Sequence, residues 1–163
     1  MTNNDILRRI RYIFDFNDDK MIKLFALADC KVTRAEISDW MKQEDDPAFK
    51  KLNDTLLATF LNGFINDKRG KKEGPQPVAE KKLTNNAIFM KLKIALNLQS
   101  EDILHIMDLS DFRMSKHELS AFFRKEGHKH YRECKDQILR TFLKGLQKQY
   151  RKDETSEEEF KWE

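Results

Sequence analysis

The sequence predicts an all-α protein made of two tandem homologous four-helix repeats that pack together. Shifting the chain by 82 positions aligns residues 3–69 with residues 85–151 without a gap, and 15 of the 67 paired positions are identical. Apolar residues recur at helical spacing in both copies, and a Thr/Ser-x-x-Glu capping box opens a helix at the same place in each. A unit of about 70 residues is marginally stable alone. We therefore expect the two copies to share a core.

Each repeat is expected to contribute four helices with polar residues at their starts, as helix N-caps require. In the first repeat the expected helix starts are Asn4, Asn17, the Thr33–Glu36 capping box and Asp54. In the second repeat they are Asn86, Ser100, the Ser115–Glu118 capping box and Asp136. The first helix is expected over about residues 5–16 and the fourth over about 54–68.

The organisation expected along the chain is a helical repeat over 1–70, a linker over 71–84, a second repeat over 85–152 and a disordered acidic tail over 153–163. The linker is rich in Gly and Pro. The first repeat has 12 basic and 12 acidic residues, whereas the second has 14 and 8, a surplus of +6. The tail has 1 and 6, which gives −5. A neutral repeat thus precedes a basic repeat that ends in an acidic segment.

The duplication also serves as a control, because a side chain that the scaffold needs should recur in the other copy. Gly63 and Gly145 recur in mid-helix, where Gly costs about 1 kcal/mol relative to Ala. We expect a helix to pack closely there, with the fourth helix against the eighth across the repeat interface. Asp29 and Asp111 are expected to form turns. Two further recurring pairs, Glu44 with Arg69 and Glu126 with Arg151, are interpreted as ion pairs, with a ligand site as the alternative.

No sequence motif indicates an enzymatic reaction. The sequence has no Gly-rich phosphate loop, HExxH or CxxC motif, so we expect neither enzymatic activity nor a cofactor. Cys30 and Cys134 align with apolar residues and are interpreted as core residues. His128 and His130, with His117, are too weakly patterned for a zinc site. No apolar run is long enough to span a bilayer, which needs about 20 residues, and the N-terminal residues lead us to expect no secretory signal. We expect a cytoplasmic protein with no membrane partner.

Positive charge is the remaining signal of function. Basic side chains recur along the first, fifth and eighth predicted helices and in a loop of the second repeat. The candidate anion- or nucleic-acid-binding residues are Arg8, Arg9, Arg11, Lys91, Lys93, Lys129, Arg132, Arg140, Lys144, Lys148 and Arg151. Positive charge next to aromatic rings is typical of proteins that hold phosphates and stack bases. A solvated helix face is the simpler alternative.

The duplicated pattern also resembles a bacterial family of uncharacterised cytoplasmic proteins typified by YehS. The resemblance is carried by three segments of the first repeat and by three of the second. The segments are Asn4-Asp5-Ile6-Leu7-Arg8 with Arg11-Tyr12, Phe60-Leu61-Asn62-Gly63, Lys68-Arg69-Gly70, Asn85-Asn86, residues 132–137 and residues 142–146. It covers both repeats to about residue 150 and implies a cytoplasmic protein with two copies of a domain of unknown function.

Stacked helical repeats commonly present a groove to a partner. The first hypothesis is therefore a non-enzymatic binding or adaptor protein that recognises a protein or peptide through a helical groove. The alternative is a nucleic-acid-binding protein that uses the basic face of the second repeat. A third hypothesis is an enzyme with a site between the repeats. The acidic tail is further hypothesised to fold onto the basic second repeat and compete with its ligand.

Overall fold

Two units of four helices make up the chain. The structure is a computed structural model that describes residues 1–151, and this part of the chain holds eight α-helices and no strand. The first unit contains α1 (Asn3–Ile13), α2 (Asp18–Leu27), α3 (Arg34–Met41) and α4 (Asp54–Arg69). The second contains α5 (Asn85–Ala95), α6 (Ser100–Leu109), α7 (Lys116–Ala121) and α8 (Asp136–Tyr150). The all-α prediction is confirmed. The predicted acidic tail, 153–163, lies outside the described residues.

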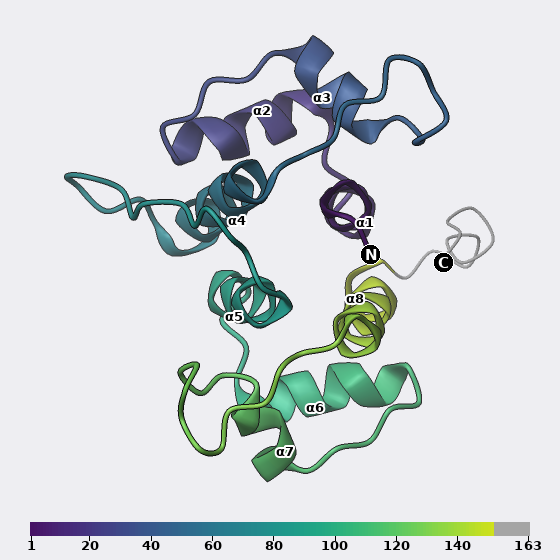
Figure 1. Ribbon diagram of the computed structural model, residues 1–163, viewed down its shortest axis with the longest axis vertical. Coiled ribbons are helices and arrows are strands. Elements are labelled where there is room, and N and C mark those ends of the chain that lie inside the picture. The colour runs from purple at the N-terminus through teal and green to yellow at the C-terminus, as the bar shows by residue number, and fades with distance from the viewer. Residues whose placement is uncertain (152–163) are drawn as a thin grey trace.

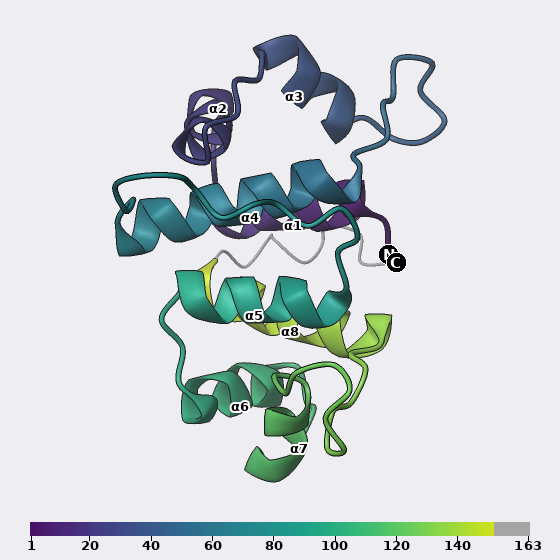
Figure 2. The same cartoon turned by 60° about the vertical axis from the view of Figure 1, so that its left-hand side comes forward.

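The helices form four layers, which Figures 1 and 2 show from two directions. Helices α2 and α3 form one outer layer, and α6 and α7 form the other. The two inner layers are α1 with α4 and α5 with α8. The repeats therefore meet along two seams, where α4 packs on α5 and α1 packs on α8, and the α4–α5 contact is the more extensive. The expected contact between the fourth and eighth helices is replaced by these two.

The recurring glycines serve packing inside each repeat. A Cβ on Gly63 would lie 2.6 Å from the carbonyl carbon of Leu24 in α2, and one on Gly145 would lie 2.9 Å from that of Ile106 in α6. Real Cβ atoms do not approach backbone so closely, so only Gly lets these helix pairs cross. Close packing is confirmed, but the predicted location across the repeat interface is wrong.

One apolar core runs through both repeats. Each half has a buried aromatic pair, and Phe60 and Phe142 are the members that match at the repeat offset. Phe25 and Phe60 have ring centroids 5.3 Å apart, and Phe89 and Phe142 have theirs 4.5 Å apart. Cys134 is buried and Cys30 is half-buried against the core, which agrees with their interpretation as core residues.

Asn4 and Asn86 have a different role from the predicted N-caps. The N-caps are Thr2 and Thr84, whereas Asn4 is buried. Its side-chain amide donates to the carbonyls of Trp40 and Lys50, and its oxygen accepts the backbone N–H of Leu52. Asn86 repeats all three bonds with residues 122, 132 and 134. These residues hold the loop between the third and fourth helix of each repeat.

Other local predictions are confirmed. The capping boxes of α3 and α7 are both present. Asp29 and Asp111 have φ of 58° and 57°, a left-handed conformation that Asp tolerates in turns. None of the helices within residues 1–151 has the length and apolar character needed to cross a bilayer.

Candidate functional site

The α4–α5 seam begins at a carboxylate with two donors. Asp54 Oδ1 accepts a hydrogen bond of 2.7 Å from the Asn3 side chain, and Oδ2 accepts one of 2.8 Å from the backbone N–H of Leu83. These hydrogen bonds hold the pKa of Asp54 below its ordinary value, with that from Asn3 the largest cause. The N-cap of α4 is Asn53. Asp54 therefore joins the repeats instead of capping its helix as predicted.

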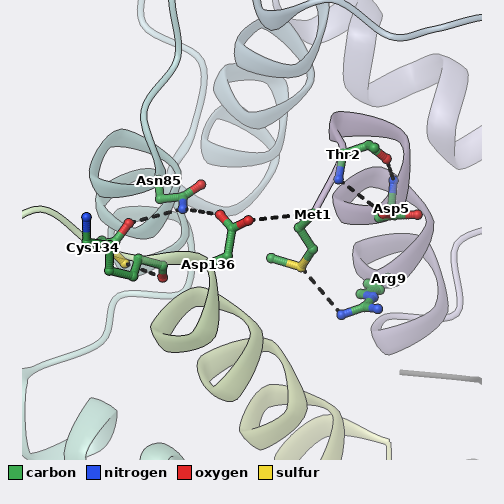
Figure 3. A network of polar contacts seen from close by, with 8 residues as sticks. Met1, Thr2, Asp5, Arg9, Asn85, Cys134 and Asp136 are labelled. Carbon is green, nitrogen blue, oxygen red and sulfur yellow. Dashed lines mark hydrogen bonds and ion pairs between the residues drawn. The ribbon is translucent and has the colours of Figure 1, made fainter. Parts of the chain in front are cut away.

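The α1–α8 seam repeats this arrangement with the two halves exchanged. Asp136 Oδ1 accepts a hydrogen bond of 2.7 Å from the Asn85 side chain, and Oδ2 accepts one of 2.9 Å from the Met1 nitrogen (Figure 3). Met1 is the repeat counterpart of Leu83. The N-cap position of α8 is Lys135, so Asp136 too serves the seam. The exchange shows that an approximate two-fold relation connects the two halves.

Helices α1 and α8 run parallel along their seam. Met1 and Asp136 meet at the N-terminal end. At the C-terminal end, Arg151 Nη1 donates a hydrogen bond of 2.9 Å to the carbonyl of Tyr12, and its guanidinium carbon lies 4.0 Å from the centroid of the Tyr12 ring. A guanidinium over an aromatic face is attracted by the ring quadrupole. Arg151 also lies 3.7 Å from Asp15. The predicted Glu126–Arg151 pair is therefore replaced by contacts to the other repeat.

The two seams differ in charge although they share a scaffold. Seven basic residues lie on α1, on α8 and at Arg151, and three of the seven matching positions of the α4–α5 pair are basic. The seven are Arg8, Arg9, Arg11, Arg140, Lys144, Lys148 and Arg151. Their counterparts are Met90, Lys91, Lys93, Ala58, Asn62, Asn66 and Arg69. Repeat packing therefore does not require the excess charge on α1 and α8.

The linker crosses the α4–α5 seam. Thr55 of α4 donates to the carbonyl of Glu80, and Lys91 of α5 lies 3.1 Å from the Glu80 carboxylate. Lys91 also donates to Asn62 of α4 at 2.6 Å. The linker thus supplies a carboxylate to the basic side chain between these two helices.

A pocket of about 590 Å³ opens at the C-terminal end of the α1–α8 seam. We call it the arginine pocket. Its lining residues are Arg8, Arg11, Tyr12, Asp15, Phe16, Asn17 and Arg151. Three guanidinium groups and two aromatic rings make it suited to an anionic ligand that has apolar parts.

Acidic neighbours offset part of this positive charge. Arg8 forms an ion pair of 2.6 Å with Asp5, and Arg11 forms one of 2.8 Å with Asp18. Unused donors remain, however. The Nε atoms of Arg8, Arg140 and Arg151 are buried and have no hydrogen-bond acceptor within residues 1–151. A buried donor without an acceptor is costly, so these three donors favour a ligand that carries oxygen acceptors.

The structure separates the other predicted binding residues from the pocket. Lys91 lies at the opposite seam, and Lys93 lies 5.7 Å from the centroid of the Phe123 ring. Arg132 lies over the Phe122 ring, and Lys129 is in the exposed loop after α7. The basic residues of the second repeat therefore do not share one face. The residues brought together come from both repeats.

Lys148 and Arg9 have contacts of their own. Lys148 donates to the carbonyl of Leu109, as its counterpart Asn66 donates to that of Leu27, so it also serves the scaffold. Arg9 is buried, and its Nη1 lies 3.4 Å from the Met1 sulfur (Figure 3).

Sequence reasoning missed Asn3, Asn85 and the aromatic lining of the pocket. Asn3 and Asn85 are identical at the repeat offset, a signal that was available. Tyr12 has no such signal, because its counterpart is Ile94.

Three histidines and a buried cysteine are the groups to consider for metal binding or nucleophilic chemistry. His117, His128 and His130 lie near one another, with centroids 6.2 Å apart for His117 and His130 and 5.5 Å apart for His128 and His130. Within residues 1–151, however, no three His, Cys, Asp or Glu side chains form a group that could hold a metal ion. Burial raises the pKa of the Cys134 thiol to about 12, which disfavours the thiolate that a nucleophile requires.

Comparison with known proteins agrees with this two-copy architecture. The sequence profile of the family described as "Protein of unknown function (DUF1456)" matches residues 3–70 and again residues 85–152. The chain belongs to this family. A relative, "Uncharacterized protein YehS" of Escherichia coli (strain K12), is 42% identical over 147 residues, which cover 90% of this chain and 94% of the relative. No solved structure is significantly similar.

Proposed function

We propose that the protein is a non-enzymatic, cytoplasmic binding protein that holds an acidic segment of a partner protein along the α1–α8 seam. The observation that carries this proposal is the excess of basic residues on α1 and α8 over their repeat counterparts. The scaffold folds with fewer basic residues at the α4–α5 seam, so the excess at the α1–α8 seam needs another explanation. Recognition of an anionic ligand supplies one.

The chemistry of the seam favours carboxylates. Arg140 and Arg151 are separated by 11 positions, about 16 Å along α8, a distance that about five residues of extended peptide span. Arginine pairs with carboxylates through two parallel hydrogen bonds. The Nε atoms of Arg8, Arg140 and Arg151 have no acceptor within residues 1–151, so a carboxylate that reached them would satisfy them.

Single-stranded nucleic acid fits this seam less well. Proteins that bind it without sequence preference stack bases on aromatic faces. At this seam the Tyr12 ring is covered by the Arg151 guanidinium. Phe14 and Phe16 stack on each other with centroids 5.6 Å apart. These contacts leave less aromatic surface for stacking bases.

Fluorescence anisotropy with a labelled peptide of about eight glutamates tests this proposal; an extended octamer would span the seam. The proteins to compare are the full chain, a chain that ends at Lys152, and R140Q/K144Q and K68Q/R69Q variants of both. K68Q/R69Q removes the same charge from exposed positions of α4 and is the matched control.

We expect R140Q/K144Q to weaken peptide binding about tenfold, because two partly buried contacts to carboxylates contribute about 1.4 kcal/mol together. K68Q/R69Q should change the affinity by less than about twofold. Binding should also weaken steeply with salt. Equal affinity in both variants, or absence of binding at low salt, would overturn the proposal. Tighter binding of a single-stranded RNA of similar length would replace it with the nucleic-acid alternative.

A further inference from the structure

We propose that residues 153–163 of this chain occupy the α1–α8 seam in cis and compete there with the partner's acidic segment. This inference rests on the proposed function, because both place carboxylates at the same seam. Three observations support it: the place where the described chain ends, the charge of residues 153–163, and the path of the linker at the other seam.

The described chain ends at the seam itself. Helix α8 ends at Tyr150, and the next residue, Arg151, lines the arginine pocket. The chain then continues for 12 residues, from Lys152 to Glu163. Fully extended, they reach about 40 Å, whereas the 15 residues of α8 extend about 22 Å. The segment is therefore long enough to return along the whole seam.

The composition of this segment complements the seam. Residues 153–163 contain six acidic residues and one basic residue, together with Phe160 and Trp162. The arginine pocket offers three guanidinium groups beside Tyr12 and Phe16. Carboxylates pair with guanidinium groups, and the aromatic side chains can take guanidinium groups on their faces. An acidic segment with aromatic residues is therefore the kind of ligand that the seam is built to hold.

The linker shows how a segment at this position of the repeat behaves. Residues 70–81 come after α4 as residues 152–163 come after α8, at the same offset of 82. The linker runs back along α4, as Figure 2 shows, and Gln76 accepts a hydrogen bond from Asn66 there. Glu80 then pairs with Lys91 across the seam. A segment that followed the same path after α8 would run along α8 toward Arg9, the counterpart of Lys91.

Trp162 offers a direct test, because the chain has two tryptophans and the other can be replaced conservatively. Trp40 is buried, and its repeat counterpart is Phe122. The W40F substitution therefore leaves Trp162 as the only tryptophan, which can be excited selectively over tyrosine at about 295 nm, and the other repeat already has Phe at the matching position. The measurement is quenching of Trp162 by acrylamide, with a synthetic peptide of residues 153–163 as the unprotected reference. Circular dichroism checks that each variant folds.

At low salt, we expect the quenching efficiency of Trp162 by acrylamide to be lower by about twofold or more in the full chain than in the peptide. About 1 M NaCl, where the Debye length is about 3 Å, should remove most of this protection. R140Q/K144Q should also remove it, whereas K68Q/R69Q should not. In the glutamate-peptide titration, the full chain with E157Q/E158Q/E159Q should bind about tenfold more tightly than the unaltered full chain.

Two results would overturn the inference. One is that acrylamide quenches Trp162 as efficiently in the full chain as in the free peptide at low salt. The other is equal loss of protection in K68Q/R69Q and R140Q/K144Q, which would place the segment elsewhere. If either occurs while the glutamate peptide still binds through Arg140 and Lys144, the proposed function stands and only the cis contact is rejected. If the glutamate peptide does not bind, the proposed function fails as well.

Discussion

The nitrogen of Met1 donates a hydrogen bond of 2.9 Å to Oδ2 of Asp136, from one repeat to the other. At the second seam the donor is the backbone N–H of Leu83 and the acceptor is Asp54, so the contact recurs with the halves exchanged. The carboxylate contacts at the N-terminal ends of the two seams thus form a matched pair. A residue that breaks the match, such as Arg140 opposite Ala58 or Lys144 opposite Asn62, is not required by the scaffold and becomes a candidate for function.

The matched carboxylates should make stability depend on pH in the acid range. Hydrogen bonds from Asn3 to Asp54 and from Asn85 to Asp136 are the largest causes that lower the two pKa values. A lowered folded-state pKa stabilises the protein above the unfolded-state value of about 3.9, and this stability is lost as pH falls through the folded-state value.

The test is urea unfolding of the wild type and of D54N/D136N at a series of pH values. We expect the variant to be less stable near pH 7, and the difference to shrink between about pH 5 and pH 2. A difference in the free energy of unfolding that stays constant over this range would show that the two carboxylates do not contribute through their ionisation.

Replacing Gly63 by Ala should destabilise the fold through backbone contact between α4 and α2. The added Cβ would lie 2.6 Å from the Leu24 carbonyl carbon, so the helices must separate. Overpacking of this kind costs about 1–3 kcal/mol or more, and the helix propensity gained from Ala returns about 1 kcal/mol. We expect a net loss of about 2 kcal/mol, measured by chemical unfolding. Lys68→Ala on the exposed face of α4 should change stability by less than about 0.5 kcal/mol. A neutral G63A would contradict the close crossing.

The repeat made the fold predictable from the sequence, but it did not reveal which residues touch. Helical spacing and the capping boxes gave all eight helices. Sequence position alone placed Asn4 at a helix start and suggested a cap, because a cap is the commonest local role of Asn there. Its actual partners, Trp40 and Leu52, are distant in sequence. The contact between Arg151 and Tyr12 at the candidate site could not be predicted for the same reason. The two residues are 139 positions apart, and no local sequence pattern relates them.

Substitution of Asn4 distinguishes its buried role from that of a cap. Asn4→Ala removes three hydrogen bonds, of which those to the Trp40 carbonyl and from the Leu52 N–H are buried and that to the Lys50 carbonyl is partly buried. Each unsatisfied buried group costs about 1–3 kcal/mol, so we expect a loss of at least about 3 kcal/mol. Thr2→Ala removes the true N-cap of α1 and should cost about 1 kcal/mol. Equal losses in the two variants, measured by urea unfolding, would restore the capping interpretation of Asn4.

The two thiols should differ in reactivity because their surroundings differ. Cys134 is 2% exposed, and burial, with the nearby Asp136 carboxylate, raises its pKa to about 12. Cys30 is half-buried, and its pKa is raised by burial and by Glu36. The thiolate is the reactive form, so both thiols should react more slowly at pH 8 than a free thiol does.

We expect a disulfide reagent at pH 8 to modify one thiol in the native protein and a second only in denaturant. The Cys30→Ala substitution should abolish thiol modification in the folded protein and leave the modification of Cys134 in denaturant. Rapid native labelling of Cys30→Ala would instead mean that the loop held by Asn86, which contains Cys134, opens in the folded state.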